Sequence, residues 1–184
     1  MKRWLIIILS FLSCRKIDNK GYVSYDIKQN KHRSVFRIKT TRSKKIEFSC
    51  VFDQSAVYKT KDPNNQADIN KLYGLSDCGT NHMESSIRFG WRWYDDSLEI
   101  HWFKHSDSKF SFGKICNVTL GLPFKCSLKI KEDKYVMNVD GNEVEIIRAP
   151  CGLNYYRYYL YPYFGGDETA PHDIRIKIKN EKNM

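Results

Sequence analysis

The chain has 184 residues, enough for one domain with a sizeable core, and carries a net charge of +10. Its lysines and arginines are spread along the chain, and only Lys39–Lys45 is dense, with the composition of a hairpin loop. Because basic faces that bind nucleic acid need clustered charge, we expect no nucleic-acid partner. The sequence also lacks a phosphate loop, a dinucleotide fingerprint and a Ser-His-Asp order.

The first 13 residues have the features of an export signal. Lys2-Arg3 is a short basic region, and Trp4–Leu12 is an apolar run too short to span a bilayer. The segment Phe11-Leu12-Ser13-Cys14 resembles the lipobox of bacterial lipoproteins, although Phe11 stands where leucine is usual. This resemblance implies cleavage before Cys14 and acylation of that cysteine. A plain signal peptide and a buried first strand are the alternatives.

These features predict the organisation of the chain and its location. We expect a lipoprotein signal peptide over residues 1–13, an acylated Cys14 with a polar tether over 14–20, and one β-sandwich domain over 21–180. The protein would then be secreted to the cell envelope, in the periplasm or on the outer membrane, and its lipid anchor at Cys14 would hold it to the membrane. Loss of Lys2 and Arg3 lowers the net charge to +8, which suits an acidic partner such as a uronic or sulfated glycan. A solvated surface with spare lysines is the alternative.

The segment before residue 85 predicts several short strands and one helix. Alternating or β-branched runs predict strands in four places: 22–27, 34–40, 46–52 and 56–60. Over Gln66–Tyr73, the apolar residues lie near helical spacing, and Gly74 suits the position just after a helix end.

The segment Ser86–Phe103 predicts a hairpin around which the rest of the sheet is built. A two-residue turn at Asp95-Asp96 would place Trp93 opposite Leu98, Trp91 opposite Ile100 and Phe89 opposite Trp102. The same register places Arg92 opposite Glu99 as a cross-strand ion pair, with Arg88 and a half-exposed His101 on that polar face.

The remainder predicts a meander and two further strands. Asp140-Gly141 is a strong hairpin signal between Tyr135–Val139 and Glu143–Arg148. Asn154–Phe164 is aromatic on both phases of a strand, and Asp173–Lys179 alternates with isoleucine inward. About ten to twelve short strands with almost no helix predict an all-β fold, an antiparallel β-sandwich of the jelly-roll kind. An up-and-down barrel is the alternative.

Six cysteines include Cys14 and no Cys-x-x-Cys pair, so a zinc ribbon is not expected. An exported chain can pair four of the other five, which are Cys50, Cys78, Cys116, Cys126 and Cys151. Cys50 and Cys126 lie on the apolar phase of their strands, which suits small buried hydrophobic residues.

Two resemblances arise from these segments. The strand, Asp-Gly hairpin and strand at Leu128–Ile147, behind a tryptophan-rich hairpin, resembles concanavalin A-like lectin/glucanase and laminin-G-type jelly rolls. Tyr161–Ile178 together with Phe89–Ile100 resembles blocks of secreted bacterial β-sandwich lipoproteins of no assigned activity. The resemblances imply a fold and a location rather than a reaction.

A lyase site is one hypothesis. Jelly-roll alginate lyases combine an arginine strand, a Gln-Ile-His strand and a Tyr-x-Lys strand on one sheet, and Arg88, Arg92, His101 and Tyr163 are the matching candidates here. Arginine would neutralise a uronate carboxylate, histidine or tyrosine would take the C5 proton, and tyrosine would protonate the leaving oxygen. Glu99 stands where the resemblance expects glutamine, and Phe164-Gly165-Gly166 where it expects a lysine-containing run.

A carbohydrate-binding face is the preferred hypothesis. Aromatic rings stack on the apolar faces of sugars, and polar neighbours bind hydroxyls. Tyr159, Tyr161 and Tyr163 lie on the less hydrophobic phase of their strand, and Arg92 and His101 lie on the polar face of the hairpin. We therefore predict glycan binding by these five residues. A lyase or glycoside hydrolase on the same jelly roll and a structural envelope protein are the alternatives.

A metal site has weaker support. Asp167, Glu168, His172 and Asp173 cluster in one glycine-rich loop, where calcium is the ion that oxygen ligands would suit. An ordinary turn explains the same residues, so no cofactor is predicted.

Overall fold

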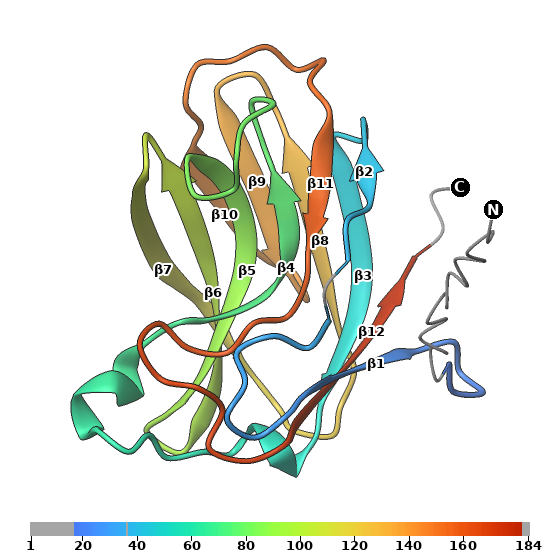
Figure 1. Ribbon diagram of the computed structural model, residues 1–184. Helices are drawn as coiled ribbons and strands as arrows, with labels where there is room; N and C mark the ends of the chain where they lie inside the picture. Colours follow the sequence, from blue (N-terminus) through green and yellow to red (C-terminus); the bar gives the residue numbers. More distant parts are fainter. Residues whose placement is uncertain (1–16, 36, 182–184) are drawn as a thin grey trace, which may run out of the picture.

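The computed structural model describes residues 17–35 and 37–181, so the predicted signal peptide and Cys14 lie outside the described residues. The described chain forms two facing layers of strands (Figure 1). In this part of the chain no helix is long and apolar enough to cross a bilayer.

The two layers are six-stranded sheets whose neighbouring strands all pair antiparallel. The first sheet has the order β1 (Val23–Ile27), β12 (Ile174–Asn180), β3 (Lys45–Phe52), β8 (Phe124–Ile130), β9 (Lys134–Val139) and β10 (Asn142–Ile147). The second sheet has the order β2 (Thr40–Thr41), β11 (Arg157–Leu160), β4 (Asn70–Ser76), β5 (Ser85–Tyr94), β6 (Ser97–Ser106) and β7 (Lys109–Val118). The predicted all-β antiparallel sandwich is therefore confirmed.

The central hairpin has the predicted register. Trp91 lies opposite Ile100 and Arg92 opposite Glu99, and the turn residues Asp95 and Asp96 have φ of 47° and 51°. Positive φ at both central residues is the signature of a type I′ turn, whose twist matches that of the flanking strands. The predicted turn at Asp140-Gly141 shares this feature, with φ of 46° and 94°.

The core lies between the sheets and is strongly aromatic. Phe48 of β3 meets Phe89 of β5 edge-on with ring centroids 5.4 Å apart, and Phe52 packs 4.9 Å from Trp91. These four rings are all fully buried. The hydrophobic phase of the hairpin thus seals one sheet against the other, and its opposite phase faces outward.

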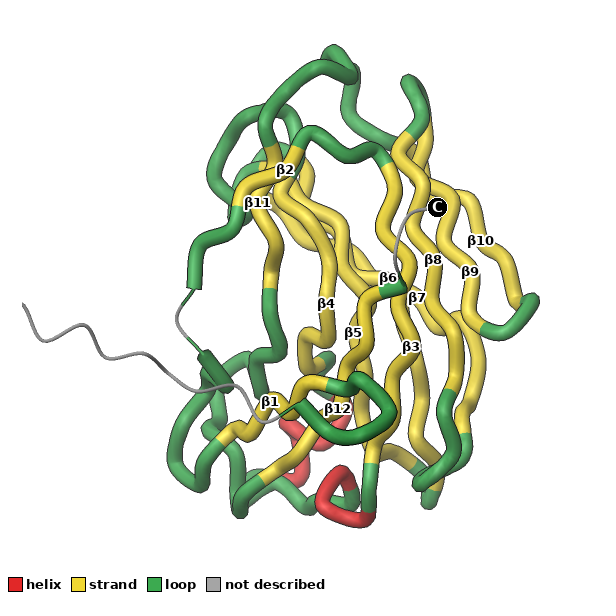
Figure 2. Tube along the Cα trace, turned by 90° about the vertical axis from the view of Figure 1, so that its right-hand side faces the viewer, coloured by secondary structure: helices red, strands yellow, loops and turns green. Residues whose placement is uncertain are grey.

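The predicted helix at Gln66–Tyr73 is wrong. A short 3₁₀ turn covers Pro63–Ala67, a second one covers Gln54–Ala56, and strand β4 begins at Asn70. Both turns lie at one end of the sandwich (Figure 2). Strand β4 is buried on both faces and has a bulge between Lys71 and Tyr73, so its apolar residues follow no strict alternation.

Three of the predicted strands are shorter or absent. Among the described residues of the predicted run 34–40, only Thr40 belongs to a strand, β2. The run 56–60 is irregular, and Arg157–Leu160 is the strand that forms inside Asn154–Phe164. Tyrosines occupy both phases of that last segment, so the pattern alone did not fix its ends.

The cysteines divide into one disulfide and three free thiols. Cys78 and Cys151 are bonded, at a sequence separation of 73. Cys50 and Cys126 are free and fully buried, as expected of small hydrophobic residues, and Cys116 is free and half-buried.

Candidate binding groove

Two cross-strand rows on the outer face of the second sheet organise the candidate site. Strand pairing sets Leu160, Gly74, Arg88, Phe103 and Phe112 side by side across five strands. The neighbouring row runs through Ser76, Ser86, His105 and Phe110, with the backbone of Tyr158 bonded to Ser76. Residues directly opposite share a face, so each row places a small residue of β4 on one side of a basic side chain and ends in a phenylalanine on the edge strand β7.

An open groove of about 580 Å³ lies over these rows. Six basic side chains line it or the adjoining hollow of about 370 Å³. Arg33, His82 and Arg88 line both, Lys71 and His105 line the larger groove alone, and Arg37 lines the smaller hollow alone. The carboxylates that line the groove are Asp68 and Asp167. The two hollows share Arg33, His82, Arg88 and Tyr163, so they form one continuous surface.

Arg88 lies at the centre of this surface and is only 7% exposed. Its Nε has no hydrogen-bond partner, and no carboxylate of the described residues lies within ion-pair distance. Burial lowers the pKa of Arg88 to about 10, so the group stays charged at neutral pH. A buried cation without a counter-ion is costly, which points to an anion that the groove takes up.

His105 lies one row away from Arg88 and is 5% exposed. The Ser86 hydroxyl donates its hydrogen to the carbonyl of His82 at 2.7 Å, and its oxygen lies 3.4 Å from Nδ1 of His105. Because this hydroxyl hydrogen is already used, Nδ1–H of His105 is the donor of the longer contact, which leaves Nε2 as the acceptor. Burial and the charge of Arg88 lower the pKa of His105 to about 4, so the ring is neutral at pH 7.

Lys71 and Tyr163 are held together by the backbone. Lys71 donates its N–H to the Tyr163 carbonyl at 2.8 Å, and Tyr163 returns the bond at 2.9 Å. The Lys71 ammonium lies 4.7 Å from the centre of the Phe103 ring, and burial, followed by Arg88, lowers its pKa to about 8. The Tyr163 ring stacks on His32 at 5.1 Å, which fixes its orientation in the groove wall.

His82 reaches the groove from the loop between β4 and β5. Its backbone N–H donates to the Tyr158 hydroxyl at 2.7 Å, and its Nδ1 lies 3.0 Å from the same oxygen. Burial and the charges of Arg88 and Arg33 lower the pKa of His82. Strand β11 thus fixes the loop that forms one wall of the groove.

The predicted pair Arg92 and His101 belongs to an internal ion cluster. Glu99 accepts from Arg92 at 2.6 Å, from His101 at 3.0 Å and from Lys114 at 2.6 Å. Burial opposes ionisation of Glu99, but these hydrogen bonds outweigh it and lower its pKa to about 2. The expected ion pair is present, whereas His101 is 2% exposed and not half-exposed. Its ring is bonded to Glu99 and lies edge-on to Phe112, with centroids 6.3 Å apart.

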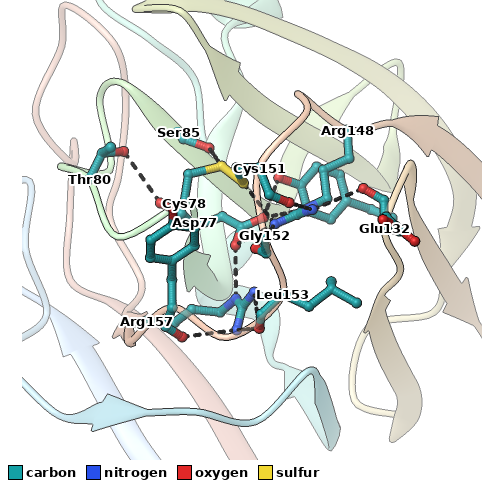
Figure 3. Close-up of a disulfide and its surroundings, with 12 residues drawn as sticks. Asp77, Cys78, Thr80, Ser85, Glu132, Arg148, Cys151, Gly152, Leu153 and Arg157 are labelled. Carbon is teal, nitrogen blue, oxygen red and sulfur yellow. Dashed lines mark hydrogen bonds and ion pairs between the residues drawn. A yellow bond between two sulfur atoms is a disulfide. The ribbon is translucent and has the colours of Figure 1, made fainter.

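The disulfide adjoins a second buried cluster, which Figure 3 shows. Asp77 accepts from Arg148 at 2.6 Å and from Arg157 at 2.9 Å, and the Tyr135 hydroxyl donates to it at 2.8 Å. Burial opposes ionisation of Asp77, but the bonds from Arg148 and the Cys78 N–H keep its pKa below its usual value. These side chains join β4, β9, β10 and β11, so the cluster braces the loops at this end of the sandwich.

The predicted tyrosine platform is divided by the structure. Tyr159 and Tyr161 pack against the core, and Tyr159 stacks on the buried Tyr73 at 5.8 Å. Tyr159 pairs with the inward Leu75, so the phase expected to face outward points inward. All three tyrosines line the smaller hollow, and Tyr163 alone also lines the larger groove.

The predicted metal ligands are used separately. Glu168 accepts from the N–H groups of Lys61 and Asp62, His172 bonds the Ser55 carbonyl, and Asp173 pairs with Lys28. Among the described residues, one group of three candidate ligands lies close together: Asp77, Cys78 and Cys151, whose two thiols form the disulfide. The loop therefore does not gather its four candidates around one point.

Sequence reasoning missed most of the basic groove. Lys71 lay in the predicted helix, and Arg33 and His82 lie in loops with no periodic signal. The outward orientation of Phe103 and His105 could have been predicted, because the alternation that places His101 outward continues through both residues. Extending the hairpin register by one pair beyond Phe89 and Trp102 would have placed Phe103 opposite Arg88.

Solved structures share this arrangement of strands at very low sequence identity. Alginate lyase AlyC3 superposes with a TM-score of 0.64 at 10% identity, over 91% of this chain and 76% of the lyase. SCLam, a non-specific endo-β-1,3(4)-glucanase from family GH16, gives 0.57 at 10% identity, over 87% of this chain and 70% of the enzyme.

A third similar structure is the laminarinase catalytic domain from Thermotoga maritima. It gives a TM-score of 0.54 at 14% identity, over 90% of this chain and 79% of that domain. No protein-family model matches the sequence, and no curated protein matches it. The likeness establishes the architecture that the sequence pattern predicted: the chain has the concanavalin A-like jelly-roll fold.

Proposed function

We propose that the protein binds an acidic polysaccharide in the groove over Arg88. The single observation that supports this most strongly is a buried arginine whose Nε is unpaired and which has Lys71, Arg33 and His82 as neighbours along the groove. A carboxylate or sulfate group satisfies a guanidinium with two parallel hydrogen bonds, and the groove supplies further donors beside it. The open shape suits a polymer that passes along the sheet.

The similar solved structures support this class of ligand. Their names describe proteins acting on alginate, on β-1,3(4)-glucan and on laminarin, which are polysaccharides of both acidic and neutral kinds. The excess of basic over acidic side chains along the groove favours the acidic kind.

Calorimetric titration of the domain with a hexuronate oligomer, a sulfated oligomer and a neutral glucan of equal length tests the proposal. The wild type should bind an acidic oligomer and not the glucan, with affinity that falls as salt rises. Arg88→Met, which keeps the side-chain length, should weaken binding about tenfold or more, since a charged hydrogen bond contributes about 1.5–3 kcal/mol. Equal binding of the neutral glucan, or unchanged affinity in Arg88→Met, would overturn the proposal.

Cleavage of the bound polymer by β-elimination is the second candidate function. The neutral His105, with Nε2 as its acceptor atom, lies one row from Arg88, and Tyr163 lines the same groove. Arg88 would neutralise the uronate carboxylate, and His105 would remove the C5 proton. The C5–H electrons would form the C4–C5 double bond as the C4–O bond breaks, and the Tyr163 hydroxyl would protonate the departing oxygen.

Absorbance of unsaturated uronate products separates binding from cleavage. If the groove is a lyase site, the wild type should produce this signal, and His105→Gln and Tyr163→Phe should each reduce the rate about 100-fold or more. Glu99→Gln is a control, because it changes the residue that departs from the lyase resemblance without touching the proposed base. Absence of product from a wide panel of polyuronates would remove the lyase and leave binding as the function.

A further inference from the structure

The phenylalanine edge of the groove is chemically distinct from its basic centre. Phe110 and Phe112 of β7 are 64% and 45% exposed, which is unusual for aromatic side chains. Both rings lie nearly parallel to Phe103, at interplanar angles of 8° and 3° and centroid distances of 5.7 and 6.3 Å. The three rings therefore form an ordered stack whose outer members present ring carbon to solvent.

This stack is continuous with the anion site. Phe103 lies opposite Arg88 on one side and Phe112 on the other, and its ring takes the Lys71 ammonium at 4.7 Å and the Arg88 guanidinium at 5.8 Å. The same groove is lined by Arg88, His105, Phe110 and Phe112. A ligand group held at Arg88 thus has an aromatic surface next to it in one direction along the row.

The spacing of the strands determines what reaches that surface. Phe112 lies two strands from Arg88, about 10 Å away at the usual strand separation. The sugar unit at Arg88 and the unit next to it do not reach that far, whereas the third and later units of a chain anchored at Arg88 do. The apolar C–H face of a sugar ring packs favourably on exposed aromatic carbon.

We propose that Phe110 and Phe112 form a stacking subsite for the apolar face of a sugar unit in the same chain whose acidic group lies at Arg88. This inference rests on the proposed function and adds what the groove selects: an oligomer and not a single acidic sugar. Charge at the centre recognises the acidic group, and ring contact at the edge recognises chain length. The affinity for a ligand should therefore rise with its number of units.

Titration of a uronate disaccharide and a uronate hexasaccharide into three proteins tests the subsite. The wild type should bind the hexasaccharide more tightly than the disaccharide. Phe110→Ala combined with Phe112→Ala should lose about tenfold in hexasaccharide affinity, as expected when two aromatic contacts of about 0.5–1.5 kcal/mol each are removed. Its disaccharide affinity should stay within about twofold of the wild type, which also shows that the groove remains folded. Ile147→Ala, which removes an 80%-exposed apolar side chain on β10, is the matched control.

The outcomes separate this inference from the function on which it rests. If the double variant binds the hexasaccharide as the wild type does while Arg88→Met does not bind, the subsite is wrong and the acidic-glycan function stands. If the affinity of the double variant falls equally for the disaccharide and the hexasaccharide, the rings do not discriminate by chain length and the subsite is again wrong. If the wild type binds neither oligomer, the proposed function and the subsite fall together.

Discussion

Buried arginines occur in two regions of this molecule with opposite surroundings. Arg148 and Arg157 lie near the disulfide with fully buried side chains, and both donate to Asp77. Arg88 lies on the outer face of the second sheet with its Nε unpartnered. A buried charge with its counter-ion braces the fold, whereas one without a counter-ion lowers stability unless a bound anion pairs with it. The groove therefore differs from the disulfide region in having no carboxylate paired with its buried arginine.

Removing the counter-ion at Asp77 should have the largest effect. Asp77→Asn keeps the size of the side chain but leaves Arg148 and Arg157 buried without a negative partner, and should lower the free energy of unfolding by about 3–5 kcal/mol. Urea unfolding followed by tryptophan fluorescence measures this loss. Tyr135→Phe removes a neutral donor to the same carboxylate and should cost about 1 kcal/mol. Equal losses in the two variants would contradict a dominant role for charge pairing.

The disulfide supports the same region and should contribute somewhat less. Replacing Cys78 and Cys151 together by serine should lower the free energy of unfolding by about 2–4 kcal/mol, since the bond closes a long loop. Cys116→Ser, which changes a free and half-buried thiol, is the control. A double variant as stable as the wild type would show that the Asp77 cluster alone holds these loops.

The central hairpin could be predicted from the sequence, whereas the groove could not. The hairpin register followed from Trp91, Ile100 and a two-residue turn, because strict alternation and a short turn leave one pairing. The groove joins Leu160, Gly74 and Arg88, which are far apart in the sequence, so its composition depends on a strand order that the pattern did not contain.

Two individual residue predictions failed because of the local structure of their strands. Lys71 was hidden because β4 is buried on both faces and bulged, which removes the period of a strand. The orientation of Tyr159 could not be predicted because tyrosine occupies both phases of the segment; its pairing with Leu75 packs it against the core, and it lines the smaller hollow together with Tyr161. In each case the missing information was the neighbouring strand, which sets the side of the sheet that a residue faces.

Substitution of Arg88 should raise the free energy of unfolding, whereas Asp77→Asn should lower it. Arg88→Met removes an unpaired buried charge while filling the same volume, and should raise the free energy of unfolding by about 1–2 kcal/mol. Arg175→Met, which removes an exposed arginine paired with Asp26, should change it by less than about 1 kcal/mol. Thermal and urea unfolding measure both values. A strong loss of stability in Arg88→Met would mean that this arginine serves the fold rather than a ligand.

The smallest effect should appear in the titration of His105. In the folded wild type its pKa is about 4, below the usual value of 6.5, so the unfolded chain takes up this proton first. The contribution of His105 to stability is therefore complete above pH 6.5 and is lost as the pH falls toward 4. Because Arg88 is the charged neighbour with the largest effect on His105, Arg88→Met should raise this pKa more than Lys71→Met does. Histidine NMR titration measures both shifts, and an unchanged His105 in Arg88→Met would show that the two groups do not share one electrostatic field.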